Sequence, residues 1–168
     1  MGDGYFFNFD KMTYVKGKRA LGCVLCMVRD GSPEVADLTV WRDGRFIVSV
    51  NLYPYNPGHL LVYPLRHVED VRELIETEER GLETLQRRFL DLLDRAYSPH
   101  GYTIGYNMGA PAGASISHLH LHMIPRYRGE MGIADLIGGK RVLVEDPRET
   151  ARRLREMVSQ EPFSISSS

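Results

Sequence analysis

The alternation of apolar and polar residues along the chain predicts five β-strands. Apolar residues alternate with polar ones on both sides of Asp43 and Gly44, a dipeptide typical of tight turns, so residues 37–50 are expected to form a hairpin. Three further apolar runs have the length of strands, at residues 59–63, 102–108 and 118–124. Pro125 is expected to end the last strand, because proline has no N–H for a strand ladder.

Two stretches have the period of amphipathic helices instead. In residues 78–97 apolar side chains recur at helical spacing, and Ser98 and Pro99 follow as a stop. The apolar positions are Leu82, Leu85, Phe89, Leu92 and Ala96. A second helix is expected after Asp146 as its N-cap, with Pro147 in the first turn and Glu149 completing a capping box. Its buried stripe would be Ala151, Leu154 and Val158.

Strands joined by hairpins, with helices on one side, predict an α+β domain with an antiparallel sheet. The 168 residues contain no internal repeat and no convincing linker, so we expect a single domain over residues 1–161. Residues 162–168 are rich in serine and have little to bury, which predicts a disordered tail.

Composition and charge narrow the possible partners. Apolar residues make up 43% of the chain and charged residues 26%, which is typical of a soluble globular protein. A net charge of -1 argues against a nucleic-acid partner, which would need a surplus of Lys and Arg. No apolar run is long enough to cross a membrane, and residues 1–11 lack the apolar stretch of a signal peptide, so a cytoplasmic location is expected. A disulfide between Cys23 and Cys26 is then not expected.

The candidate chemistry centres on three histidines that alternate with leucine: His118, His120 and His122. Side chains two apart on a strand share a face, so the three imidazoles are expected to project together. Leu119, Leu121 and Met123 would project the other way, into a core. The spacing alone is equally compatible with catalysis and with simple metal binding.

The segment before these histidines is rich in small and polar residues. Asn107, Gly109, Gly113 and Ser115 could form a loop whose backbone N–H groups hold a phosphate. The loop is not a P-loop, because the Gly-Lys-Ser/Thr ending is missing. Together with the histidines, it would place anion donors next to three imidazoles.

Two blocks of sequence resemble the histidine-triad (HIT) family. Residues 113–124 resemble the family motif in which histidine alternates with apolar residues, and residues 51–62 resemble its nucleoside-binding strand-turn-strand. The second block is most similar to the diadenosine-polyphosphate hydrolase and phosphorylase branch. The resemblance spans roughly residues 23–126, and it implies a HIT-like antiparallel sheet of about five strands with a long helix and a C-terminal helix packed on it.

The resemblance implies a covalent mechanism on the triad, with His118 as its first member. His120, the middle histidine, would attack the α-phosphorus of a nucleotide and form a nucleotidyl-histidine intermediate. Water, or phosphate as another acceptor, would then release the mononucleotide. His122 would contact phosphate oxygens or the leaving group. A neutral imidazole suits the attacking role when an acceptor holds its second nitrogen.

The resemblance also implies roles for residues around the triad. Ser115 would donate to a bridging or leaving oxygen, and the backbone around Gly113 would stabilise charge in the transition state. Asn51 matches the family's residue for the ribose hydroxyls, and Asn107 matches an amide that orders the phosphate or the site. His59 lies where the family keeps a histidine beside the triad.

Cys23 and Cys26 form a C-x-x-C pair, which alone is a modest metal signal. A branch of histidine-triad proteins, and the similar galactose-1-phosphate uridylyltransferases, carry such a pair. The resemblance then implies a structural zinc ion held by Cys23, Cys26, His67 and His118. In the alternative interpretation the thiols are simply small buried side chains, and His67 lies on a surface turn.

The sequence therefore favours a nucleotidyl hydrolase or transferase acting at the α-phosphate of adenine nucleotides such as diadenosine polyphosphates. A phosphorylase remains open, and a nucleoside phosphoramidate hydrolase is the first alternative. A nucleotide- or zinc-binding interaction protein with incidental turnover is the alternative from another class. His122 stands where the uridylyltransferase branch has Gln, which disfavours uridylyl transfer to a sugar. The loop after the triad lacks the Asn-Phe-Met expected of the branch, although Arg126 and Arg128 there could attract a polyphosphate. The family also implies a homodimer through the helix of residues 78–97 and a sheet edge.

Overall fold

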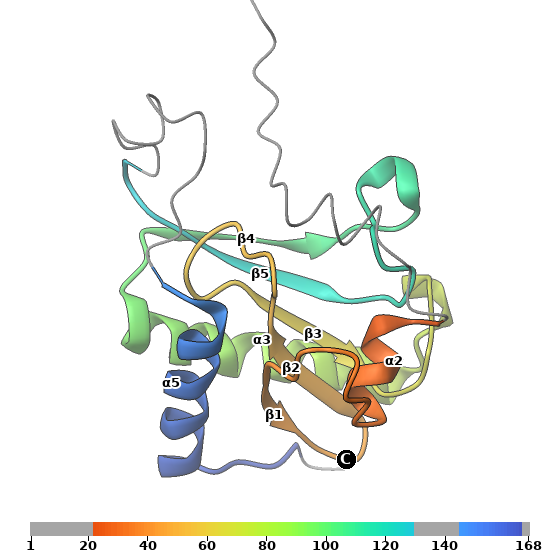
Figure 1. Cartoon of the computed structure of the whole chain (residues 1–168), viewed down its shortest axis with the longest axis horizontal. Coiled ribbons are helices and arrows are strands. Elements are labelled where there is room, and N and C mark those ends of the chain that lie inside the picture. Colours follow the sequence, from red (N-terminus) through yellow and green to blue (C-terminus); the bar gives the residue numbers. More distant parts are fainter. Residues whose placement is uncertain (1–21, 130–144, 166–168) are drawn as a thin grey trace, which may run out of the picture.

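The computed structural model describes residues 22–129 and 145–165, which contain one five-stranded antiparallel sheet (Figure 1). The strand order is β1-β2-β3-β5-β4. The strands are β1 (Thr39–Arg42), β2 (Phe46–Val50), β3 (Leu60–Pro64), β4 (Gly101–Tyr106) and β5 (Leu121–Arg126). The helices are α2 (Val24–Arg29), α3 (Glu76–Tyr97) and α5 (Pro147–Gln160), with short 3₁₀ turns η1 (Val71–Glu73) and η2 (Ala110–Ala112). The predicted α+β fold with five strands is confirmed.

The hairpin predicted around Asp43 is present. The Asp43 carboxylate accepts hydrogen bonds from the backbone N–H groups of Arg45 and Phe46, each at 2.7 Å, which closes the turn between β1 and β2. β2 and β3 then pair in register over five residues, from Phe46 with Pro64 to Val50 with Leu60. This pairing carries the chain from the hairpin to the centre of the sheet.

The last strand differs from the prediction at both ends. It begins at Leu121, not His118, because the residues before it bond to the loop beyond β3: the Leu119 N–H donates to the Val68 carbonyl at 2.7 Å. Pro125 lies inside the strand and does not end it. The ladder with β3 stops at Met123, so Pro125 pairs only with Tyr102 of β4. The fourth strand also ends two residues earlier than expected, at Tyr106.

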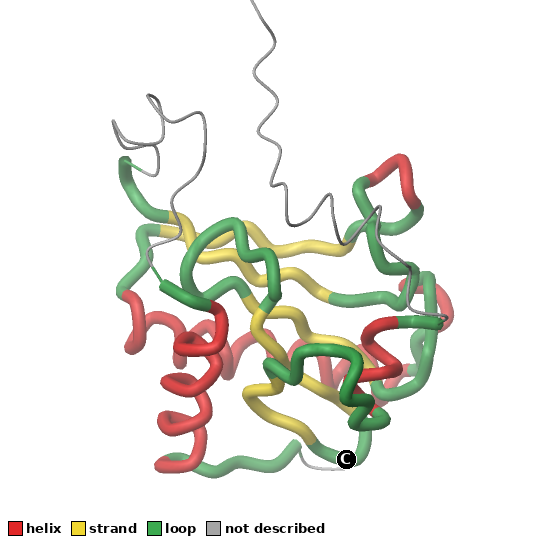
Figure 2. Tube along the Cα trace, viewed as in Figure 1, coloured by secondary structure: helices red, strands yellow, loops and turns green. Residues whose placement is uncertain are grey.

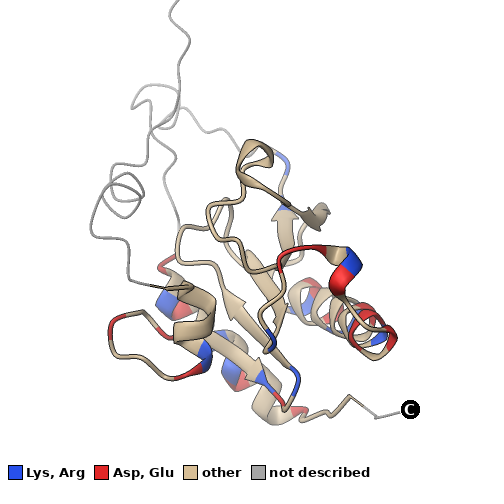
Figure 3. Ribbon diagram, turned by 90° about the vertical axis from the view of Figure 1, so that its right-hand side faces the viewer, with Lys and Arg blue, Asp and Glu red and all other residues tan. Residues whose placement is uncertain are grey.

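One face of the sheet carries the main core under α3 and α5 (Figure 2). The predicted apolar positions of α3 are buried there against Phe46, Val48, Val62 and Met123. Gly81 lets α3 approach the sheet, since a Cβ at this position would lie 2.4 Å from the Phe46 ring. Charged residues of both signs follow one another on the rest of this helix (Figure 3).

The opposite face is covered only in part, by the short helix α2. Leu25 of α2 packs there on Ile47, Leu61 and Tyr63. His122 lies opposite Leu61 in the ladder, and residues directly opposite one another point to the same side of a sheet. The α2 face therefore receives the histidine side chains, while Leu121 and Met123 enter the main core as predicted.

The C-terminal helix begins as predicted, with the Asp146 carboxylate accepting from the Arg148 N–H at 2.7 Å. Glu149 does not complete the predicted capping box, because its carboxylate accepts from Arg152 instead. Ala151 and Leu154 are buried, whereas Val158 is only partly buried.

The chain after α5 continues along the core to residue 165. Phe163 stacks on Trp41 with ring centroids 5.0 Å apart, which differs from the disorder expected for this part of the tail. Residues 166–168 lie outside the described residues, and the domain boundary at 161 stays a prediction. Among the described helices, none is long and apolar enough to cross a membrane.

Candidate nucleotide and metal site

A cavity of about 250 Å³ opens on the α2 face of the sheet. Six of the predicted site residues line it: Asn51, Asn107, Gly113, Ser115, His120 and His122. The apolar part of the lining includes Leu25, Val28 and Leu38. An apolar wall with a few polar and imidazole groups is the usual composition of a small-molecule site.

His120 is held in one tautomer by the backbone. Its Nδ1 lies 2.7 Å from the carbonyl oxygen of His118, and a carbonyl can only accept, so Nδ1 carries the proton. The lone pair is therefore on Nε2. Burial lowers the pKa of His120, which keeps the ring neutral near pH 7. A neutral imidazole with an exposed lone pair is a nucleophile.

His59 fixes the tautomer of the neighbouring His122 through a hydrogen bond. The Tyr55 N–H donates to His59 Nδ1 at 3.1 Å, so His59 carries its proton on Nε2. That nitrogen lies 3.0 Å from His122 Nδ1 and donates to it, which places the His122 proton on Nε2. His59 is 0% exposed and lies behind His122. The ring centroids of His120 and His122 are 4.6 Å apart, so the ring that carries the Nε2 lone pair lies beside the ring that carries the Nε2–H donor.

The loop of η2 borders the same cavity. Gly113 has φ +89°, a conformation that favours glycine, and a Cβ there would lie 3.8 Å from Asn107 Nδ2. The N–H groups of Ala112, Gly113 and Ala114 all donate to carbonyls within the turn. The backbone around Gly113 is thus engaged in its own turn. The side chains of Asn107 and Ser115 are the donors that this loop offers to a phosphate.

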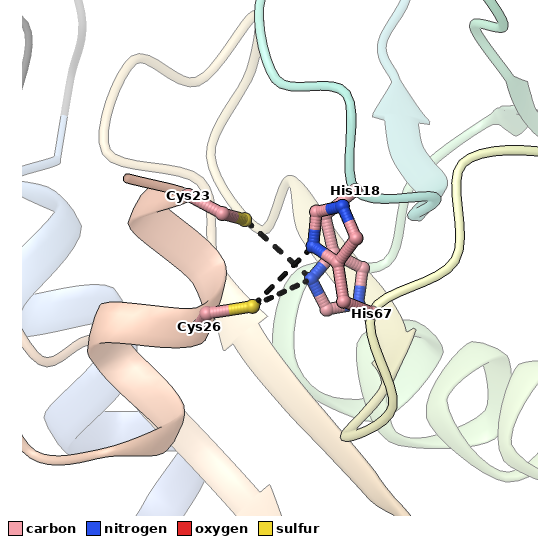
Figure 4. Close-up of side chains that lie close together, drawn as sticks. All are labelled: Cys23, Cys26, His67 and His118. Carbon is pink, nitrogen blue, oxygen red and sulfur yellow. Dashed lines mark hydrogen bonds between the residues drawn. The ribbon is translucent and has the colours of Figure 1, made fainter. Parts of the chain in front are cut away.

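His118 lies with Cys23, Cys26 and His67 in the cluster that the family resemblance implied, and it does not stand beside His120 and His122 as the alternation alone predicted. Its ring lies 4.8 Å from that of His67, and its Nδ1 lies 3.6 Å from the sulfurs of both Cys23 and Cys26 (Figure 4). His67 Nδ1 is 3.4 Å from Cys26 Sγ. The cluster gathers the N-cap of α2, its first turn, the loop after β3 and the segment before β5.

This cluster fits a tetrahedral metal ion. His118 Nε2–H donates to the Pro64 carbonyl at 2.9 Å, and His67 Nε2 lies 3.2 Å from the Glu69 carboxylate, so both Nδ1 lone pairs face the thiols. Zinc bonds of about 2.3 Å to sulfur and 2.0 Å to nitrogen place neighbouring sulfur and nitrogen ligands about 3.5 Å apart. All four ligand atoms lie within 4.8 Å of one another.

The pKa shifts of two members of the cluster, His118 and Cys26, bear on metal binding. Burial lowers the pKa of His118 to about 4, so its ring is neutral and able to ligate. Burial and the neighbouring Cys23 raise the pKa of Cys26 to about 11, and a metal ion would displace that proton. The carbonyl of His118 accepts from His120, so one residue joins the two halves of the site.

Some residues of the site could not be found from the sequence. Leu25 and Val28 of the apolar wall belong to α2, whose six residues are too few for a helical period to be recognised. Glu69 was missed although it stands two residues after His67. Arg126 and Arg128 were expected near the substrate, but neither is among the described residues that line the cavities.

Comparison with known proteins places these features in a family. A profile of the HIT domain matches residues 32–129. The chain is 35% identical over 134 residues to a protein named AP-4-A phosphorylase from Mycobacterium tuberculosis, covering 77% of this chain and 69% of that one. It is 35% identical over 88 residues to the bis(5'-nucleosyl)-tetraphosphatase (asymmetrical) of Schizosaccharomyces pombe, covering 52% of this chain and 48% of that one. In fold it is similar to a zinc-bound histidine triad family protein from Mycobacterium smegmatis, with a TM-score of 0.67 and 24% identity over 83% of this chain and 95% of that one.

Proposed function

Since the chain belongs to the HIT domain family, we propose that it is an enzyme that cleaves dinucleoside polyphosphates, such as diadenosine tetraphosphate, at the α-phosphate. The observation that carries the proposal is the His120 ring, whose Nδ1 is held by a carbonyl and whose Nε2 lone pair belongs to a cavity with phosphate donors. The names of the relatives from Mycobacterium tuberculosis and Schizosaccharomyces pombe support the substrate class.

In the first step, His120 Nε2 forms a bond to the α-phosphorus, and the bond from that phosphorus to the bridging oxygen breaks. The leaving polyphosphate takes the electron pair. His122 donates from Nε2 to the phosphate or the leaving oxygen, and Ser115 donates from its hydroxyl. The His118 carbonyl holds the Nδ1 proton of His120, which stabilises the positive charge on the phosphorylated ring.

In the second step, a water molecule, whose proton passes to the solvent, or a phosphate ion attacks the phosphorus. The P–N bond breaks, and its electron pair returns to Nε2 of His120. Asn51 is proposed to bind the ribose hydroxyls, and Asn107 to order the phosphate. The apolar wall of Leu25, Val28 and Leu38 would receive the base.

The cluster around His118 and the two thiols, called the metal half of the site, is proposed to bind zinc. The ion would fix the position of His118 and thereby the backbone carbonyl that orients His120. Cys23, Cys26, His67 and His118 would hold the ion, with no coordination position left for substrate. Soft thiolates with imidazoles favour zinc among the common divalent ions. The role is structural, because the chemistry proposed above needs no Lewis acid.

A second cavity, of about 950 Å³, shares Ser115 and Ile116 with the first and provides space for a leaving group. Its charged lining is Glu69, Asp70, Glu73 and Arg72. Three carboxylates against one guanidinium would suit an amine better than a polyphosphate. This observation favours a nucleoside phosphoramidate hydrolase as the second candidate.

The assembly is proposed to be a homodimer. The apolar stripe of α3 is consumed in the monomer core, which leaves β4 as the more suitable element. β4 is an edge strand with Ile104 exposed. Light scattering on the purified chain would test this state. The cytoplasmic location also stays a prediction.

One product analysis tests the function. Diadenosine tetraphosphate is incubated with the protein in ¹⁸O-labelled water, with and without phosphate, beside an adenosine 5'-phosphoramidate substrate. AMP carrying the label plus ATP is expected for hydrolysis, and ADP plus ATP only with phosphate for phosphorolysis. Two ADP would contradict attack at the α-phosphorus. Rapid turnover of the phosphoramidate alone would favour the second candidate, and tight AMP binding without any turnover would favour a binding protein.

A further inference from the structure

A carboxylate outside the four-residue cluster completes the metal half of the site. Glu69 Oε1 lies 3.2 Å from His67 Nε2. A carboxylate can only accept, so the ring donates from Nε2 and its Nδ1 lone pair is directed to the side of Cys26. His67 lies in the loop between β3 and η1 with its side chain 37% exposed, whereas His118 is buried.

The same carboxylate has a second partner. The side chain of Ser117, the residue directly before His118, also contributes to lowering the pKa of Glu69, after the larger effect of His67. Glu69 thus lies between the loop that carries one histidine ligand and the segment that carries the other. That segment continues into Ser115 on one side and His120 on the other, so the connection reaches the nucleotide cavity.

The neighbouring carboxylates do not share this arrangement. Asp70 pairs with Arg72, and Glu73 accepts from the backbone N–H groups of Glu69 and Asp70, so both are committed to the cap of η1. Glu69 is the acidic side chain of this loop that contacts a member of the metal cluster.

We propose that Glu69 is a positioning residue for the bound metal ion: it holds His67 in the ligating tautomer and ties it to the His118 segment. The inference rests on the metal site proposed above and is independent of the substrate. In metalloproteins, the partners that orient a ligating histidine typically change metal affinity by 10- to 100-fold when they are removed.

A purely structural role predicts a different outcome. The side chains of His67 and Glu69 are 37% and 61% exposed, and ion pairs at this exposure contribute little to folding. Replacement of Glu69 should therefore leave the metal-free protein nearly as stable as before, with a Tm within about 2 °C of the wild type.

The test compares zinc dissociation constants, measured by competition with a chromogenic chelator, for the wild type, Glu69→Ala, Glu69→Gln and Glu79→Gln. Glu79 is an exposed carboxylate on α3 and serves as the matched control. Glu69→Ala is expected to weaken binding by about 10- to 100-fold. Glu69→Gln should lose less, since its amide oxygen still accepts from His67, and Glu79→Gln should match the wild type.

Two results would overturn the proposal. One is wild-type zinc affinity in Glu69→Ala. The other is a metal-free Tm for Glu69→Ala well below that of Glu79→Gln, which would make the role structural. A wild-type chain that binds no zinc would overturn both this inference and the metal site. Turnover of diadenosine tetraphosphate in the same samples would then report on the proposed enzyme separately.

Discussion

The nucleotide half of the site and its metal half use the same device, a histidine whose tautomer is fixed by a hydrogen bond to its other nitrogen. They differ in how they are assembled. In the nucleotide half, His122 stands on β5 opposite Leu61 of β3, and His59 directly precedes β3, so strand pairing alone brings these rings together. In the metal half, the thiols lie 92 and 95 residues from His118.

This difference indicates which half depends on an added component. In the nucleotide half, His122 is part of the sheet ladder and His59 directly precedes β3, although Leu25 and Val28 of the cavity wall belong to α2. The metal half depends on α2, a helix of six residues that packs on the sheet through Leu25. A metal ion would supply the missing connection, so its removal should affect α2 and His118 first and the strand-borne rings second.

The largest effect expected comes from breaking the nucleotide half at its nucleophile. His120→Ala removes the atom that bonds to phosphorus, and the other ring held by a carbonyl, that of His118, directs its lone pair to the thiols. Turnover of diadenosine tetraphosphate should fall by at least about 10⁴-fold. Steady-state rates measured by product chromatography check this, with zinc content measured on the same samples and expected to be unchanged.

His100→Ala is the matched control, since His100 is an exposed histidine whose ring accepts from the Arg128 N–H. It should retain wild-type turnover. More than about a hundredth of wild-type turnover in His120→Ala would mean that another group attacks the phosphorus.

Much of this comparison could be predicted from the sequence. The period-two pattern of Leu121 and Met123 is enough to place the core face of β5, and Asp43 with Gly44 is enough to place the hairpin. These features are local, because a few neighbouring side chains decide them. The residues of the nucleotide cavity followed from two blocks that resemble a known family, and the structure brings those residues together.

The parts that local patterns could not predict depend on contacts between distant segments. The alternation alone predicted that His118 shares a face with His120, and only the family resemblance implied its place beside the thiols of α2, where the Pro64 carbonyl also holds its ring. Pro125 was expected to end β5, and only the position where β3 stops pairing explains why it does not. Phe163 stacks on Trp41, although more than a hundred residues separate them in the sequence, and no local pattern predicts such a contact.

The second-largest effect is expected from a substitution that disrupts the metal half and leaves the nucleophile His120 in place. Cys26→Ser replaces a thiolate with a poor zinc ligand and should weaken zinc binding by roughly 10³-fold, because each of four ligands supplies a share of the binding free energy. Turnover should fall much less, by about tenfold, since the His118 carbonyl remains. Chelator competition and steady-state kinetics on one preparation measure both quantities.

The two substitutions thus have opposite expected effects. His120→Ala should lose turnover and keep its zinc affinity, whereas Cys26→Ser should lose most of its zinc affinity and keep much more of its turnover. Equal zinc affinity in Cys26→Ser and the wild type would remove Cys26 from the ligand set. A loss of turnover in Cys26→Ser as large as in His120→Ala would mean that the two halves are not separable.

A third change sharpens the comparison inside the nucleotide half. His59→Phe keeps a buried ring but removes the donor to His122 Nδ1, so the His122 proton is no longer fixed on Nε2. The kcat for diadenosine tetraphosphate should fall by about 10²-fold, in the range of a lost general acid, with KM within a few-fold.

The leaving group separates this role from simple misfolding. The amine of an adenosine 5'-phosphoramidate departs only when it is protonated, whereas p-nitrophenolate departs as an anion. His59→Phe should therefore slow cleavage of the p-nitrophenyl ester of AMP by less than about tenfold and that of the phosphoramidate by more. An equal loss on both substrates would show that His59 acts through the packing of the site. His59→Gln, which can donate from its amide, is expected to recover part of the kcat.

The smallest effect is expected from the ion pair between Arg66 and Glu78, which lies next to the metal half in the chain. The Arg66 guanidinium, next to His67 in the chain, donates to both carboxylate oxygens of Glu78 at 2.7 and 3.1 Å, and Glu78 also accepts from the Ile75 N–H. Glu78→Gln should lower the free energy of unfolding at pH 7 by about 1–2 kcal/mol, because Arg66 is half exposed and keeps access to water. Urea unfolding of the metal-free protein measures this, with the exposed Glu79→Gln as control.

The pH dependence of that deficit shows whether the charge is responsible. The bonds from Arg66 hold the pKa of Glu78 below its usual value, so their stabilisation is present above about pH 4.5 and is lost as the pH falls through the lowered pKa. The difference between Glu78→Gln and the wild type should therefore shrink as the pH falls from 7 to 3. A deficit that stays constant over this range would assign the effect to the shape of the side chain. Because the pair acts through the fold and touches no ligand atom, zinc affinity should change by less than tenfold, in contrast to the loss expected for Cys26→Ser.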